Sequence, residues 1–333
     1  ASHVAARVLL LRHFGAGRLA RIMSSAMSVE TPVRLLDMSE DEQRVIADAL
    51  CNPLNPRVAM GLCSTCQSLR RLMHAQLVQL RDRHRAARAL CAHLGTSCDA
   101  VLGSSRLNWR FNALGPPQCH VVGMLFLSNA LASLKDLHLD GNPLTDEGMS
   151  TLAAGLVPGA MPALVSFVCI DTQLGDRAAA DLGRAIAHGG VPALTSLNLN
   201  QNQIGDSGVQ ALAAGLGGVA LDTLMLDANV IGDRGLRLLL GAAASLRALK
   251  HLSLSQNQVT DHGLRALAEL ERGAMPALEL IWLDENQIGD AGLRQLASAL
   301  AEGSVLPQLE EIYLEGNPAS DAAKEELKNV LGG

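Results

Sequence analysis

Apolar positions repeat along the C-terminal two thirds of the chain. The first clear copy runs from Leu134 to Gly148 and has leucine at positions 134, 137, 139 and 144. Similar copies begin at Leu194, Leu221, Leu249 and Leu278, and more divergent ones at Leu164 and Leu309. A motif that returns in register predicts a stack of similar structural units and not one irregular core.

Each copy has one residue of a polar column eight positions after its first leucine. The column is Asn142, Thr172, Asn202, Asn229, Asn257, Asn286 and Asn317. Intervals of 27 to 31 residues are typical of a unit that combines a strand with a full helix. A fainter copy, with Leu107, Trp109, Asn112 and Leu114, stands 30 residues before the first, and we expect it to be the first repeat.

The positions of the unit predict local structure. Leu-x-x-Leu-x-Leu predicts a short strand, because alternate side chains of a strand point to the same face. The Asn amide can bond to backbone groups of the adjacent unit, which predicts a ladder that Thr172 interrupts. Four residues further on, each copy has an aspartate, which we expect to cap a helix: Asp146, Asp176, Asp206, Asp233, Asp261, Asp290 and Asp321.

These residues resemble leucine-rich repeats of the ribonuclease-inhibitor-like class over about 107–333. The resemblance implies an α/β fold, a curved solenoid with a parallel inner sheet and outer helices, which takes up partners on its concave face. It implies no catalytic role. We therefore expect a leucine-rich-repeat solenoid of about eight repeats over 105–333.

The preceding residues lack the repeat and predict a small all-α domain over 28–104. The pattern of Leu36-Asp-Met-Ser-Glu followed by Leu54-Asn-Pro-Arg57 and Leu62-Cys63 is similar to an F-box, although the usual Leu-Pro start is absent. That resemblance implies docking onto the adaptor of a cullin ubiquitin ligase. The matching apolar positions, which burial within the domain would explain equally well, are Ile46, Leu50, Leu54 and Leu62.

Charge divides the chain into two contrasting parts. Residues 1–115 have 15 basic and 8 acidic residues, a net charge of +7, whereas the remainder has 12 basic and 25 acidic residues, a net charge of −13. An acidic solenoid repels phosphates, so we expect no nucleic-acid partner. Residues 1–27 are basic and free of acids, which indicates either a transit-like leader for an organelle or an ordinary helix.

The sequence shows no motif for catalysis, a cofactor or a metal. Seven cysteines without dense pairing favour an intracellular, reducing compartment, with the cytoplasm as the first interpretation and an organelle as the second. Cys63, Cys66, Cys91 and Cys98 have poor spacing for zinc, and we interpret them as free thiols. No apolar run reaches the length of a transmembrane helix.

A partner-binding site is expected where strand side chains point away from the helices, four residues before the Asn column. This slot holds His138, Val168, Asn198, Met225, Ser253, Trp282 and Tyr313. Trp282 and Tyr313, with Leu280 beside them, predict aromatic anchors of an interface, although aromatic residues also suit strands in general. The acids expected around them, which either solvate this face or attract a basic partner, are Asp140, Asp227, Asp284, Glu285, Glu311 and Glu315.

Three functions remain open at this point. The first is a non-catalytic scaffold that binds a basic protein, of which the chain's own arginine-rich helix is one example. The second is an F-box-type substrate receptor of a ubiquitin ligase. The third is an accessory structural subunit of a large organelle assembly, which only the basic leader suggests.

Overall fold

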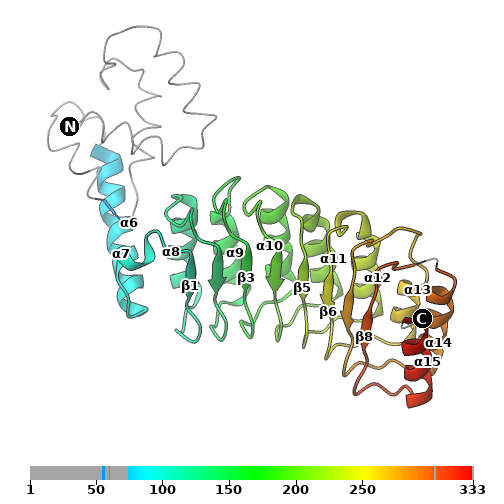
Figure 1. Cartoon of the computed structure of the whole chain (residues 1–333). Coiled ribbons are helices and arrows are strands. Elements are labelled where there is room, and N and C mark those ends of the chain that lie inside the picture. The colour runs from blue at the N-terminus through cyan, green and yellow to red at the C-terminus, as the bar shows by residue number, and fades with distance from the viewer. Residues whose placement is uncertain (1–54, 57–59, 61–73, 304, 332–333) are drawn as a thin grey trace, which may run out of the picture. The chain divides into compact units, whose positions relative to one another are not determined.

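Eight short strands and the helices between them dominate the computed structural model (Figure 1), which describes residues 55–56, 60, 74–303 and 305–331. The chain divides into two compact units, residues 1–89 and 90–333. The expected leader over 1–27 and the adaptor-binding positions Ile46, Leu50, Leu54 and Leu62 lie outside the described residues.

Strands and helices alternate without exception after the first two helices. The strands are β1 Arg106–Asn108, β2 Asp136–His138, β3 Ser166–Val168, β4 Ser196–Asn198, β5 Thr223–Met225, β6 His251–Ser253, β7 Leu280–Trp282 and β8 Glu311–Tyr313. The helices are α6 His74–His93, α7 Cys98–Val101, α8 Pro116–Leu127, α9 Thr145–Gly155, α10 Asp176–Ala187, α11 Asp206–Gly215, α12 Asp233–Gly241, α13 Asp261–Ala268, α14 Asp290–Ala301 and α15 Asp321–Leu331, with 3-10 turns η2 Leu216–Gly218 and η3 Ala243–Ser245.

All eight strands form one parallel sheet in sequential order, each paired with the next. The central residue of every strand is apolar and at most 7 % exposed, because it points toward the helices. These residues form one column across the sheet: Leu107, Leu137, Phe167, Leu197, Leu224, Leu252, Ile281 and Ile312. The fold is therefore the expected leucine-rich-repeat solenoid. We call the side of the sheet that the helices leave uncovered the concave face.

The Asn column forms the expected ladder between repeats. In Asn257, the side-chain Oδ1 accepts from the backbone N–H of Ile231 in the preceding repeat at 3.0 Å, and Nδ2 donates to the Leu226 carbonyl of that repeat at 2.9 Å. The other Asn side chains repeat both bonds with small changes. A buried amide therefore satisfies backbone groups of two adjacent turns, which fixes their spacing.

Thr172 interrupts this ladder, and the preceding repeat changes shape as a result. Its hydroxyl donates to the Cys169 carbonyl of its own repeat and to Asn202 of the following repeat, both at 3.1 Å, so neither partner belongs to the preceding repeat. The N–H of Leu144, which would meet an Asn side chain at this step, instead donates to the Asn142 carbonyl at 2.8 Å. Helix α9 then begins at Thr145, one residue before Asp146, whereas α10 to α15 each begin at the aspartate of their repeat.

The Asp column is structural, but it does not cap its own helices as the sequence predicts. Asp176 is the first residue of α10, and its Oδ1 accepts from the N–H of Gly205 in the next repeat at 2.7 Å. The same bond joins Asp146, Asp206, Asp233, Asp261 and Asp290 to the next repeat. Successive helices pack side by side, so each of these carboxylates reaches the residue that precedes the next helix. The Asp column is therefore a second ladder.

Candidate protein-binding face

Strand register places the predicted outward slot in one row on the concave face. Met225 pairs with Ser253, Ser253 with Trp282, and Trp282 with Tyr313. Tyr313 is 40 % exposed, Met225 and Trp282 are half-buried, and Ser253 is buried. Leu280 is half-buried two residues before Trp282, on the same face. The structure therefore brings the predicted apolar residues together over β5 to β8.

The two aromatic anchors form a stack. The ring centroids of Trp282 and Tyr313 lie 5.6 Å apart with an interplanar angle of 4°. His251, which the sequence analysis did not select, meets Trp282 edge-on with a centroid separation of 6.1 Å. It pairs with Leu280 in the sheet, so a comparison of that slot across the repeats would have placed it beside the aromatic residues. We call these three residues, His251, Trp282 and Tyr313, the aromatic row.

The six predicted acids divide into two groups. Asp140, Asp227 and Asp284 each accept a backbone N–H from the following repeat, at 3.1, 2.8 and 2.7 Å respectively. One oxygen of each carboxylate is thus committed to holding the repeats together. Glu285, Glu311 and Glu315 are exposed, and none of them forms an ion pair within the described part of the chain. Asp222 and Glu279 lie 3.8 and 3.9 Å from the ring nitrogens of His251, so these two acids and the three glutamates together supply the negative charge around the aromatic row.

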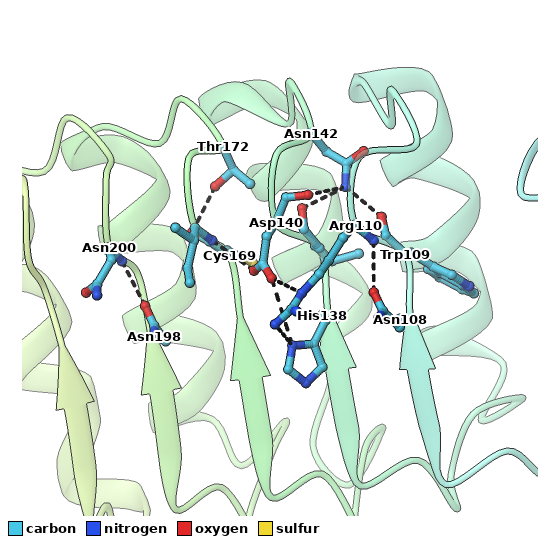
Figure 2. A network of polar contacts seen from close by, with 12 residues as sticks. Asn108, Trp109, Arg110, His138, Asp140, Asn142, Cys169, Thr172, Asn198 and Asn200 are labelled. Carbon is cyan, nitrogen blue, oxygen red and sulfur yellow. Dashed lines mark hydrogen bonds and ion pairs between the residues drawn. The ribbon is translucent and has the colours of Figure 1, made fainter.

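A second polar cluster lies at the other end of the same face, and Figure 2 shows its core. Arg110 forms an ion pair with the buried carboxylate of Asp140, and its guanidinium lies 2.8 Å from Nδ1 of His138. Arg106 pairs with Asp136 at 3.1 Å. The two arginines occupy the slots that Glu311 and Glu315 hold in the last repeat, so aligning the repeats slot by slot would have revealed this cluster.

Two effects lower the pKa of His138 below its usual value. Partial burial disfavours the charged imidazolium, and the neighbouring Arg110 guanidinium repels it, which together outweigh the attraction of Asp140 and Asp136. A neutral imidazole can accept from the Arg110 guanidinium through Nδ1. The charges within the cluster therefore balance, because each arginine pairs with an aspartate of the next repeat.

Tyr313 provides a direct optical test of the acidic end. Its hydroxyl donates to the Glu311 carboxylate, which raises the pKa of Tyr313 because ionisation would lose this bond and place two negative charges together. It is the only tyrosine in the chain, so ultraviolet absorbance reports it alone. We expect Glu311→Gln to move the tyrosinate transition to lower pH. An unchanged transition would contradict the bond, and Glu325→Gln on α15 is the control.

Comparisons with known proteins support the repeat assignment. Residues 130–153, 192–213 and 245–268 match the family model described as a leucine-rich repeat. The chain therefore contains leucine-rich repeats, whereas the ribonuclease-inhibitor-like subclass stays a prediction. Among solved structures, one similar chain comes from the crystal structure of a TLR13-ssRNA13 complex, with 21 % identity and a TM-score of 0.37. That similarity covers 67 % of this chain and 31 % of the other, so this chain spans about a third of its length. Curated proteins give no match.

Two further observations concern chemistry outside this face. Within residues 74–303 and 305–331, no cluster of three or more His, Cys, Asp or Glu side chains is arranged to hold a metal ion. Cys63 and Cys66 lie outside the described residues. A helix with the length and apolarity needed to span a membrane is not found in the described part of the chain.

Proposed function

We propose that this protein is a non-catalytic scaffold whose concave face over β5 to β8 binds a basic protein. The observation that carries the proposal is the Trp282–Tyr313 stack, which lies on a rigid sheet among exposed glutamates. Large aromatic side chains at the centre of an interface contribute much of the binding energy in protein complexes.

The aromatic row is already ordered before any partner arrives. Trp282 is held between the His251 edge and the Tyr313 face, and Tyr313 is tethered through its hydroxyl to Glu311. Binding therefore freezes few additional rotamers, and more of the energy gained on contact remains as affinity. An apolar surface with a fixed shape favours a folded protein surface as the partner.

Charge favours a basic partner. The side chains of Glu285 and Glu315 have no hydrogen bond or ion pair within the described residues. Asp284 adds a carboxylate whose second oxygen has only a long bond to Ser255, at 3.4 Å, whereas both oxygens of Asp227 accept hydrogen bonds within the sheet. Such a surface accelerates encounter with positive charge, an effect that salt screens beyond about 8 Å at physiological ionic strength. It repels the phosphates of a nucleic acid. The ubiquitin-ligase and organelle-assembly alternatives depend on residues 1–54 and 61–73, and no observation on the described residues favours them.

Loss of the aromatic anchors should abolish most of the binding. Partners are first identified by affinity purification and mass spectrometry of the full chain, and then tested as purified proteins. We expect Trp282→Ala and Tyr313→Ala each to weaken the affinity of such a partner by about 30-fold, the effect of losing one anchor of about 2 kcal/mol. Phe111→Ala is the matched control, since Phe111 is 77 % exposed at the other end of the sheet.

Charge reversal tests whether the acidic residues contribute to binding in addition to the aromatic ones. Glu285→Lys with Glu315→Lys leaves the inter-repeat bonds intact, because the hydrogen bonds of these residues are made by their backbones. Asp284 is unsuitable, since its reversal would break the bond to the Glu315 N–H. The double variant should slow association, with little salt dependence left, whereas Glu302→Lys with Glu325→Lys on the helical side should not. Equal affinities in all variants, or aromatic-dependent binding of a single-stranded RNA, would overturn the proposal.

A further inference from the structure

Two cysteines face each other in α6 and α7, which precede the first strand of the sheet. The sulfur atoms of Cys91 and Cys98 lie 3.5 Å apart, with the Cys98 thiol donating to the Cys91 sulfur. Cys91 belongs to the last turn of α6, and Cys98 is the first residue of α7. A disulfide bond needs a separation of about 2.0 Å, so the two sulfurs have to approach by about 1.5 Å.

The turn between the two helices holds the thiols in this position. Gly95 adopts a left-handed conformation, with φ of 63°, that ends α6 and reverses the chain. The N–H of Thr96 donates to the Cys91 carbonyl at 2.8 Å, and the Ser97 side chain accepts from the N–H of Ala100 at 3.1 Å. Because both ends of the turn are fixed by hydrogen bonds, the proximity of the sulfurs is a property of the backbone. Closing the gap requires the two side chains to rotate toward each other.

We propose that Cys91 and Cys98 are a thiol modification site that hydrogen peroxide converts into a reversible intramolecular disulfide. Cys98 is half-buried and can be reached by a small oxidant, whereas Cys91 is 3 % exposed. The remaining described cysteines, Cys119 and Cys169, are at most 2 % exposed. Access therefore selects Cys98 as the first sulfur to react.

The reaction balances with peroxide as the sole oxidant. Peroxide transfers one oxygen atom to the Cys98 sulfur, which gives a sulfenic acid and one water. The Cys91 sulfur then attacks the Cys98 sulfur; the S–S bond forms, the S–O bond breaks, and the departing hydroxide takes the Cys91 proton as a second water. Burial, with a further contribution from the neighbouring Cys98, raises the pKa of Cys91 to about 12, so little of Cys91 is thiolate at neutral pH and its attack is slow.

The test is thiol mapping of the full chain. After mild peroxide treatment and blocking of free thiols in denaturant, we expect five alkylated cysteines instead of seven, with one crosslinked peptide joining Cys91 to Cys98. A reducing agent should restore all seven. Cys91→Ser should leave Cys98 as a sulfenic acid that dimedone traps, and Cys98→Ser should leave Cys91 reduced.

Three results would overturn the proposal. The first is crosslinking of Cys98 to a different cysteine, and the second is loss of the Cys91 thiol at an unchanged rate in Cys98→Ser. The third is stoichiometric zinc in the untreated protein that protects both thiols until a chelator removes it. The wild-type protein alone decides the first result by its peptide map and the third by its zinc content, so a variant that folds poorly does not remove the test. Concave-face binding is a separate measurement, and its loss or retention leaves this proposal unaffected.

Discussion

Gly215→Ala should destabilise the solenoid by about 3 kcal/mol, the upper end of the usual cost of overpacking. Gly215 ends α11, and a Cβ atom there would lie 2.0 Å from the backbone oxygen of Gly183 in α10. That obstacle is a helix backbone and not the tip of a flexible side chain, so the two helices would have to separate. Urea unfolding followed by circular dichroism measures the loss as a lower transition midpoint.

Gly241→Ala is the matched control for this substitution. Gly241 also ends a repeat helix, α12, but a Cβ atom there would have nothing within 4 Å. Since alanine restricts the unfolded chain more than glycine does, the control should increase the free energy of unfolding by up to about 1 kcal/mol and so raise the midpoint. Similar midpoints for the two variants would show that α10 and α11 do not depend on the close approach at Gly215.

Asn257→Ala should have a comparable effect through a different cause, at roughly 3 kcal/mol for the loss of a buried polar network. The substitution leaves the Ile231 N–H without its acceptor and removes one bond from each of the Leu226 and Leu254 carbonyls. Because these groups belong to two adjacent repeats, amide hydrogen exchange should increase on both sides of the substitution. Urea unfolding gives the overall loss.

Two further substitutions test whether the effect of Asn257→Ala comes from the lost hydrogen bonds. Gln258→Ala changes the exposed neighbour of Asn257 and should leave stability within about 0.5 kcal/mol. Asn257→Thr should fall between the two, because Thr172 shows that a buried hydroxyl can bond to the carbonyl three residues before it but leaves the preceding repeat without an acceptor. If Asn257→Ala behaves like Gln258→Ala, the ladder contributes little, and leucine packing alone holds the repeats.

Much of the fold could be predicted because the same residue types return at the same places. The leucine period gave the strands and their order, and strand register confirmed that His138, Val168 and their counterparts share one slot. The Asn ladder was equally predictable, since a buried amide beside an open turn has few other partners. The role of the Asp column was not, because an aspartate at a helix start can bond either to the first amides of its own helix or to the next repeat, and only the packing of the helices selects the second.

The candidate site was predicted less completely than the fold. The concave position of Trp282 and Tyr313 followed from strand alternation, but the sequence treated six acids as equivalent, whereas Asp140, Asp227 and Asp284 bond to backbone groups of the next repeat. It also missed His251 and the Arg110–His138–Asp140 cluster. In both places the partners come from neighbouring repeats, and their contacts depend on side-chain length and direction as well as on slot.

Periodicity therefore established the solenoid, the sheet order and which strand positions point away from the helices, because burial of identical leucines imposes the same register on every repeat. Tertiary structure alone decided which carboxylates stay available, how the aromatic rings stack and which thiols meet. Those features arise from lateral contacts between repeats, where a displacement of one or two ångströms makes or breaks an interaction, and no pattern along the chain encodes distances of that size.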